Sequence, residues 1–346
     1  LRALPKIFIA KKYMRIAETT FNSDILKTTT KFDAVNPYRT LPARLEELPK
    51  GLNPFMDEGV KIHMAVLQPF EAPLNTIKTF PVFYMLHEAY ERGKLHGKKT
   101  VVEGSSGNTG KALGKLAPYF GIEETIIYVH ESTSPEKIRL MEDVGAEVRP
   151  IKNSVEHARN EGNKQGYINL GQYENPRNYM AYQPIGRMLW EQTQGIDLFV
   201  AGIGTGGTLI GIGSAIREED PANHVTTLGV IPKLGEAIPG IRDANRLQEV
   251  QLPWGDVVSP KNRGILRTIS REDAYQKSYS LWKDHNLPAG PSAGAQLAAI
   301  HEELQERRET NTLDDLRRKK DDEIVVVFIA PDSYEAYQQE YRNLTG

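Results

Sequence analysis

The sequence predicts an α/β protein whose sheets are mostly parallel. Short runs rich in β-branched residues alternate with longer segments of helical periodicity along most of the chain. Two glycine-rich turns each follow an apolar strand and open a helix. The chain has 346 residues, which is enough for about two domains with sizeable cores.

The predicted strands are short and apolar, and longer helices lie between them. We expect strands at residues 60–66, 100–103, 125–129, 147–150, 198–201, 225–230 and 323–329. We expect helices at residues 80–92, 110–120, 135–144, 154–165, 182–194, 208–217, 271–284 and 294–304. Capping residues support two of the helix starts, because Ser134 precedes Pro135 and Ser270 precedes an acidic first turn.

The two glycine-rich turns predict a pair of anion sites. The first is Gly104-Ser105-Ser106-Gly107-Asn108-Thr109-Gly110, and the second is Gly202-Ile203-Gly204-Thr205-Gly206-Gly207-Thr208. A turn of this kind aims backbone N–H groups at one point, with the positive end of a helix behind them. Two such sites suggest a ligand with two anionic ends, with a phosphate at one turn and a carboxylate at the other. The alternative is tight strand–helix packing, which one turn alone would favour.

Neither turn fits a common nucleotide motif well. Gly202, Gly204 and Gly207 formally match the dinucleotide fingerprint, but the next strand does not end in the acid that would hold a ribose. The first turn is not a Walker loop, because Ala112 stands where Ser or Thr should follow Lys111.

Composition excludes several function classes. The formal net charge of −2 gives no indication of nucleic-acid binding or of a polybasic membrane patch. Apolar runs such as residues 324–330 are far too short to span a bilayer. The absence of cysteine excludes disulfides, thiolate ligands and a cysteine nucleophile. The eight histidines show no ligand spacing, so no metal site is expected. A cytoplasmic location fits this composition.

Two further features are candidates for chemistry. Lys78 lies among Leu74, Ile77, Phe80 and Val82, and a desolvated lysine amine is a nucleophile toward an aldehyde. The segment 290–295, Gly-Pro-Ser-Ala-Gly-Ala, places the Ser292 hydroxyl ahead of a helix. Taken singly, the first is an ordinary solvated lysine and the second a helix cap.

Taken together and in order, these features resemble one family. Lys78, residues 106–110, residues 204–208 and residues 290–295 resemble the motifs of fold-type-II pyridoxal-phosphate enzymes, within the cysteine synthase and cystathionine β-synthase branch. Residues 172–176, Gln-Tyr-Glu-Asn-Pro, and residues 39–42 are similar to two more family segments. The resemblance covers roughly residues 40–335. It implies two open, twisted, mostly parallel sheets flanked by helices, as in the tryptophan synthase β subunit.

The resemblance also implies a domain division and a role for each site residue. A larger domain of residues 1–71 and 177–346 would hold the cofactor phosphate, and a smaller one of residues 72–176 would carry the Schiff-base lysine. Lys78 would bind pyridoxal 5'-phosphate and act as general base. The implied cofactor contacts are Asn108 to the ring hydroxyl, Gly204, Thr205, Gly206, Gly207 and Thr208 to the phosphate, and Ser292 to the pyridine nitrogen. The implied carboxylate-binding residues are Ser105, Ser106, Gly107, Thr109 and Gln172.

The implied activity is β-replacement by a homodimer, in which a sulfur nucleophile displaces the leaving group of O-acetylserine or O-phosphoserine. A hydroxyl at the pyridine nitrogen makes the ring a weaker electron sink than a carboxylate would, which favours β-elimination. Residues 237–242, Ala-Ile-Pro-Gly-Ile-Arg, resemble a segment of B-type sulfhydrylases, so Arg242 is a candidate for an anionic co-substrate. A surface ion pair of Arg242 with Asp243 or Glu236 is the alternative.

The chain departs from the family at Lys78. Thr79 and Phe80 stand where Asp and Arg usually follow the lysine. Two other functions therefore stay open. One is a serine or threonine dehydratase, or another β-eliminating lyase, on the same fold. The other is a non-catalytic relative that binds the cofactor or a peptide.

Overall fold

The computed structural model describes Phe32 and residues 35–38, 43–67, 76–105, 107–287, 289–318, 322–338 and 340–341. These residues fall into two compact units. The first contains Phe32 and residues 35–38 and 76–181, and the second contains residues 43–67 and all described residues from Tyr182 onward. The chain thus changes unit after residues 42, 67 and 181. The domain boundaries inferred from the family resemblance, 71/72 and 176/177, stay predictions.

The first unit is built on a parallel sheet with the strand order β5-β4-β3-β6 among its described residues. Its strands are β3 (Thr100–Gly104), β4 (Glu124–Val129), β5 (Ala146–Pro150) and β6 (Tyr167–Asn169). Its helices are α3 (Thr79–Glu91), α4 (Asn108–Leu116), η3 (Ala117–Phe120), α5 (Pro135–Glu142), α6 (Ser154–Glu161) and α7 (Arg177–Met180). A helix follows each of β3, β4 and β5, so successive strands run in one direction.

The second unit is built on a larger sheet with the order β1-β2-β10-β7-β8-β9 in the part described. The strands are β1 (Arg44–Glu47), β2 (Val60–Val66), β7 (Leu198–Gly202), β8 (Thr226–Pro232), β9 (Gly264–Ile269) and β10 (Ile324–Ala330). The helices are α8 (Gln183–Thr193), α9 (Gly207–Glu219), α10 (Trp254–Val257), α11 (Arg271–Lys283) and α12 (Pro291–Glu309). Five 3-10 segments complete it: η2 (Met56–Glu58), η4 (Ala244–Glu249), η5 (Pro260–Asn262), η6 (Leu313–Leu316) and η7 (Tyr334–Tyr337). The edge strand β1 is antiparallel to β2, and the other pairings are parallel.

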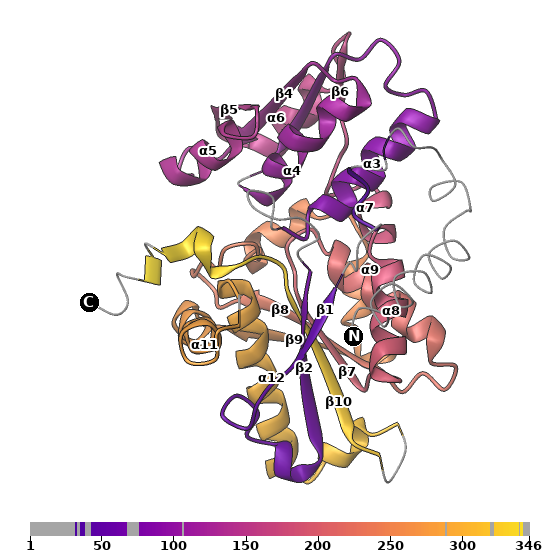
Figure 1. The fold of residues 1–346 in the computed structure, drawn as a ribbon, viewed down its shortest axis with the longest axis vertical. Coiled ribbons are helices and arrows are strands. Elements are labelled where there is room, and N and C mark those ends of the chain that lie inside the picture. Colours follow the sequence, from indigo (N-terminus) through magenta and orange to yellow (C-terminus); the bar gives the residue numbers. More distant parts are fainter. Residues whose placement is uncertain are drawn as a thin grey trace, which may run out of the picture. The chain divides into compact units, whose positions relative to one another are not determined.

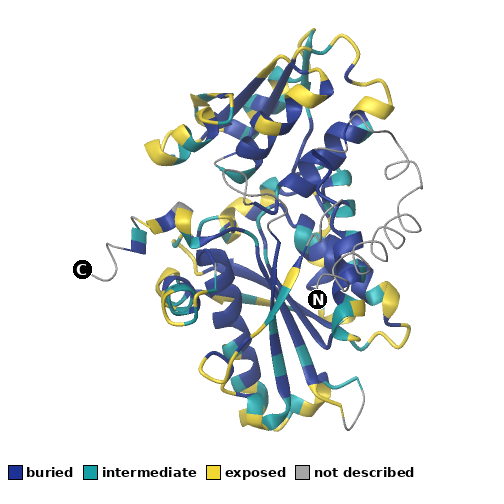
Figure 2. Ribbon diagram, viewed as in Figure 1, coloured by how far each residue is buried: buried dark blue, intermediate teal, exposed yellow. Residues whose placement is uncertain are grey.

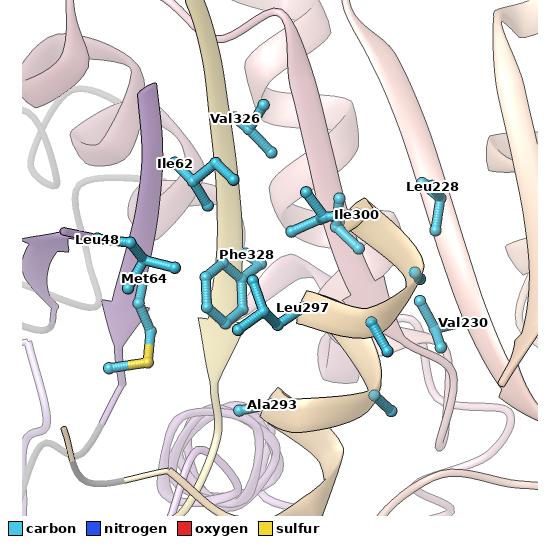
Figure 3. Close-up of a cluster of buried hydrophobic side chains, with 14 of the residues drawn as sticks. Leu48, Ile62, Met64, Leu228, Val230, Ala293, Leu297, Ile300, Val326 and Phe328 are labelled. Carbon is cyan, nitrogen blue, oxygen red and sulfur yellow. The ribbon is translucent and has the colours of Figure 1, made fainter. Parts of the chain in front are cut away.

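The core of the second unit lies between its sheet and α12 (Figure 1). β7, β8 and β10 are buried along nearly their whole length, as expected for central strands of a parallel sheet (Figure 2). Figure 3 shows Leu297 and Ile300 of α12 beside Phe328 and Val326 of β10. This packing fixes α12, and with it the turn that carries Ser292, against the strands.

The predicted α/β fold is confirmed, with several corrections to its elements. The helix expected at residues 110–120 begins at Asn108, and its last turn is the 3-10 segment η3. The helix expected at residues 294–304 runs from Pro291 to Glu309. Strands β1, β6 and β9 and the short helices α7 and α10 were not predicted. No helix in the described ranges is long and apolar enough to cross a membrane.

Candidate active site

The first glycine-rich turn lies at the carboxyl end of β3 and leads directly into α4. The turn is close-packed, because a Cβ on Gly104 would lie 2.6 Å from Val155 Cα and one on Gly110 would lie 2.5 Å from Met141 Sδ. The Ser105 hydroxyl accepts a hydrogen bond from the Gly107 N–H at 3.4 Å. The first N–H groups of α4 have no acceptor within the helix and face the turn. Ser106 lies outside the described residues.

Gln172 reaches this turn from the neighbouring strand. β6 pairs with β3 in parallel, so the chain leaving β6 emerges beside the end of β3. The Gln172 amide group donates to the Gly104 carbonyl at 2.8 Å, and its Oε1 accepts from the Thr109 hydroxyl at 2.7 Å. Ser105, Thr109 and Gln172 are all buried. The structure therefore brings together the predicted carboxylate-binding residues that it describes in this unit.

Glu103 is a buried neighbour of this turn that motif reasoning missed. One carboxylate oxygen accepts from the Gly104 N–H at 3.1 Å, and the other accepts from the Gln172 N–H at 3.4 Å. Only 2% of the residue is exposed. Burial raises the pKa of Glu103 to about 7, against the lowering effect of these hydrogen bonds. One signal could have found it: a charged residue ends an otherwise apolar strand just before a glycine turn.

Lys78 lies immediately before the first residue of α3. Its neighbours Thr76, Ile77, Thr79 and Phe80 are buried, whereas Lys78 itself is half-buried. The Lys78 N–H donates to the Thr76 hydroxyl at 3.2 Å, and the Lys78 carbonyl accepts from the Val82 N–H at 3.1 Å. The backbone at Lys78 is thus fixed. Leu74, which the sequence analysis placed beside Lys78, lies outside the described residues, as do residues 39–42.

The second glycine-rich turn lies in the second unit, between β7 and α9. Gly206 has φ +82°, and a Cβ on Gly204 would lie 2.5 Å from the Gly240 carbonyl oxygen. Both positions therefore require glycine. The Thr205 hydroxyl accepts from the Gly207 N–H at 3.3 Å, and a side-chain hydrogen bond links Thr208 to the buried Tyr182.

Ser292 lies close to this turn. A Cβ on Gly240 would be 4.0 Å from Ser292 Cβ, so Gly240 lies between Gly204 and Ser292. The Ser292 residue is 4% exposed, and its hydroxyl oxygen has no hydrogen-bond partner among the described residues. Gln296 fixes the Ser292 turn by donating to the Ser292 and Ile329 carbonyls and accepting from the Ile329 N–H.

The chemical groups of these residues match those that a pyridoxal phosphate needs. A glycine turn at the start of the thirteen-residue helix α9 suits a phosphate. A buried hydroxyl without a protein partner suits a ring nitrogen that needs a hydrogen bond. A lysine amine can bond covalently to the aldehyde of pyridoxal phosphate, and the backbone that carries Lys78 is held in place.

Arg242 is held on the segment that follows Gly240. Its N–H donates to the Ile203 carbonyl at 2.8 Å, and its guanidinium lies 2.6 Å from the Glu249 carboxylate. The side chain is 9% exposed, and Arg246 shares the same carboxylate. The alternative to a functional role was a surface ion pair of Arg242 with Asp243 or Glu236. The ion pair that the structure shows is instead with Glu249 of η4, and the Arg242 side chain is buried. No group of three or more His, Asp and Glu side chains in the described ranges could hold a metal ion.

Comparison with known proteins places this site in a family. The family model described as "Pyridoxal-phosphate dependent enzyme" matches residues 67–328. The chain belongs to this family, and it is an enzyme that depends on pyridoxal phosphate.

Its relatives point to one branch of the family. It is 31% identical over 292 residues to a cysteine synthase of Aquifex aeolicus (strain VF5), covering 81% of this chain and 83% of that protein. It is 33% identical over 221 residues to cysteine synthase B of Pseudomonas aeruginosa (strain PAO1), covering 58% and 71%.

Solved structures share the fold. One is the O-acetylserine dependent cystathionine β-synthase of Helicobacter pylori, with TM-score 0.72 and 24% identity over 90% of this chain and 97% of that one. Another is a cysteine synthase of Entamoeba histolytica, with TM-score 0.69 and 23% identity over 86% of each chain. They establish the architecture of two sheets flanked by helices.

Proposed function

We propose that this enzyme catalyses β-replacement on a serine-derived amino acid, as a cysteine synthase does. The donor is O-acetylserine or O-phosphoserine, and the nucleophile is a sulfur species. The observation that carries the proposal is the buried Ser292 hydroxyl, which has no partner in the described part of the chain. A neutral hydroxyl at the pyridine nitrogen does not hold a proton there as a carboxylate would, and this favours loss of a β-substituent over transamination.

Each predicted site residue has a role in this proposal. Pyridoxal phosphate, when bound, supplies an aldehyde for amino groups and a conjugated ring that accepts electrons released at Cα. Lys78 would bind the aldehyde, and its Nζ would act as the general base that removes the Cα proton of the substrate and later returns it. The N–H groups of residues 204–208 hold the phosphate. Asn108 would orient the ring by a hydrogen bond to the hydroxyl group of the ring.

The turn at residues 105–109 and Gln172 bind the substrate carboxylate. The buried position of Ser105 and Thr109 keeps water from the reacting carbon once the substrate is in place. Lys78 and Asn108 belong to the first unit, and Ser292 belongs to the second. We also propose a cytoplasmic homodimer that acts on small molecules in cysteine biosynthesis.

The decisive experiment is a spectral titration followed by product analysis. The protein loaded with pyridoxal phosphate is titrated with L-serine, O-acetyl-L-serine, O-phospho-L-serine and L-cysteine. We expect a change in visible absorbance with an activated donor, reversed by sulfide as cysteine accumulates. Pyruvate formed equally with and without sulfide would instead identify a lyase. An unchanged spectrum with every amino acid would contradict the proposal.

A further inference from the structure

The buried carboxyl group of Glu103 makes contacts that the proposed function does not use. It lies at the end of β3, and its two oxygens accept from two different segments: Gly104, which opens the glycine turn, and Gln172, which follows β6. Asn169 of β6 adds a side-chain hydrogen bond to the same carboxylate and also donates to the Val102 carbonyl at 2.7 Å. A single carboxylate thus joins the ends of two strands.

The hydrogen bonds around Glu103 form a closed ring. The Glu103 carboxylate accepts from the Gln172 backbone N–H. The Gln172 side chain donates to the Gly104 carbonyl and accepts from the Thr109 hydroxyl. The Gly104 N–H donates to the Glu103 carboxylate, which completes the ring. The side chain of Asn178 in α7 also fixes Gln172, because it donates to the Gln172 carbonyl at 2.5 Å. Because every member has partners, Gln172 and Thr109 are fixed before any substrate arrives.

We propose that Glu103 is a positioning residue for substrate binding, which orders Gln172 and Thr109 as a preformed site for the carboxylate of the donor amino acid. This inference rests on the proposed function of the 105–109 turn and adds to it a residue that touches no substrate. Its ionised form is the competent one, because two backbone N–H groups point at two separate oxygens. A protonated carboxyl group keeps only one good acceptor for them.

The surroundings of Glu103 set its titration near neutrality. Burial raises its pKa, and the nearby Glu174 carboxylate raises it further, whereas the hydrogen bonds from Gly104, Gln172 and Asn169 lower it. Arg159 of α6 also interacts with Glu103, but it forms an ion pair with Glu174. In the neighbouring strand β4, the residue paired in register with Glu103 is the apolar Ile127. Donor binding is therefore expected to weaken as the pH falls through about 7.

The test uses the holoenzyme and Glu103→Gln, with Glu124→Gln as the matched control. Glu124 lies at the opposite end of the same sheet, where it accepts from Thr100 at 2.9 Å. Binding of L-alanine, which has no leaving group, is followed by visible absorbance at pH 8. We expect Glu103→Gln to raise the dissociation constant about tenfold, the effect of one lost charge-assisted hydrogen bond, and Glu124→Gln to leave it unchanged.

Two further measurements separate positioning from general damage. Binding of L-alanine methyl ester, which lacks the carboxylate, should not change in Glu103→Gln. In a Gln172→Ala background, Glu103→Gln should have little further effect, because Glu103 acts through Gln172. Equal losses for the acid and the ester, or additive losses in the double variant, would overturn the inference.

The pH profile of the unaltered enzyme is a test that does not need the variant to fold. Its kcat/KM for the donor should fall about tenfold from pH 8 to pH 6, as expected for one required ionisation near 7. Glu103→Gln should remove this acid limb. A flat wild-type profile, or a limb that persists in Glu103→Gln, contradicts the inference. If wild-type holoenzyme binds no amino acid at all, the proposed function itself fails, which is a different result.

Discussion

The Thr109 hydroxyl donates a 2.7 Å hydrogen bond to Oε1 of Gln172, which joins the start of α4 to the loop after β6 across 63 residues of sequence. The two residues come from segments that look unrelated in the sequence. They meet because β3 and β6 are parallel neighbours, so both segments leave the sheet at the same edge. The glycine turn is therefore part of a larger buried polar site.

Replacing Lys78 by Ala should abolish turnover. The variant loses both the amine that binds the cofactor aldehyde and the general base, and general acid–base catalysis alone contributes about 10²–10⁴-fold. We expect the visible absorbance of the loaded protein to be lost as well. Lys115→Ala is the control, because Lys115 is an exposed lysine of α4. Wild-type turnover by Lys78→Ala would refute the assignment.

Replacing Ser292 by Ala should affect stability and cofactor binding in opposite directions. The wild-type hydroxyl is buried without a partner in the described structure, and an unsatisfied buried polar group costs about 1–3 kcal/mol. The cofactor-free variant should thus be at least as stable as wild type in denaturant unfolding, while its affinity for pyridoxal phosphate falls.

Ser278→Ala is the matched control for Ser292. Ser278 is also a buried serine of the second unit, but its hydroxyl donates to the Ala289 carbonyl at 2.9 Å and also contacts Tyr341. Its removal should lower the free energy of unfolding by about 1–3 kcal/mol. Equal destabilisation by both variants would show that the Ser292 hydroxyl is satisfied within the protein.

Replacing Gly204 by Ala should disrupt the second turn. The added Cβ would lie 2.5 Å from the backbone oxygen of Gly240, which cannot rotate away. We expect a loss of about 1–3 kcal/mol of stability and weaker binding of pyridoxal phosphate, measured by equilibrium dialysis. Gly255→Ala is the control, since its Cβ would meet no atom of the described structure within 4 Å. Unchanged affinity in Gly204→Ala would argue against phosphate binding at this turn.

Glu103→Gln should make stability less dependent on pH. The pKa of Glu103 is raised from 4.5 to about 7 in the folded protein. A raised folded-state pKa gives stability that is fully present below about 4.5 and is lost as the pH rises through about 7. Wild type should lose about 3 kcal/mol of unfolding free energy from this group between pH 4.5 and pH 8. Urea unfolding of wild type, Glu103→Gln and Glu124→Gln at these two pH values measures this, and equal pH dependence in all three would contradict it.

Arg242 and Glu249 should act oppositely on the choice of donor. Arg242→Ala should lower kcat/KM for O-phosphoserine relative to O-acetylserine by about tenfold, because a charge-assisted contact is lost. Glu249→Gln should raise the same ratio, because it removes the negative charge that lies 2.6 Å from the Arg242 guanidinium. Arg246→Ala is the control at the same carboxylate. An unchanged ratio in both test variants would assign Arg242 a structural role.

The sequence predicted central elements better than edge elements. β7 and β10 are apolar along their length, and in β2 the half-buried Lys61 and His63 alternate with buried apolar residues, so local patterns alone identify all three. β1, with the sequence Arg-Leu-Glu-Glu, and the three-residue β6 are held by pairing with a neighbour rather than by their own burial. Local pattern reading cannot see that pairing.

The residues of the candidate site also differ in how well the sequence predicts them. Glycine turns, Lys78 and Ser292 belong to contiguous motifs that sequence reading can find. The Glu103 ring and the Arg242–Glu249 pair depend on which strands are neighbours and on where the chain goes after Gly240. Those contacts arise only from the folded topology, and local sequence patterns do not contain them.

β10 is the last strand in the part of the chain that the structure describes, yet it lies between β2 and β7 in the middle of its sheet. On the ribosome, β2 and β7 therefore emerge long before the strand that joins them. The described strands of the first unit lie between Thr100 and Asn169, so they emerge before β7, β8, β9 and β10. Nascent chains that stop before Ile324 would thus leave the inner edges of two apolar strands exposed, which makes translational arrest in this gene a route to aggregation.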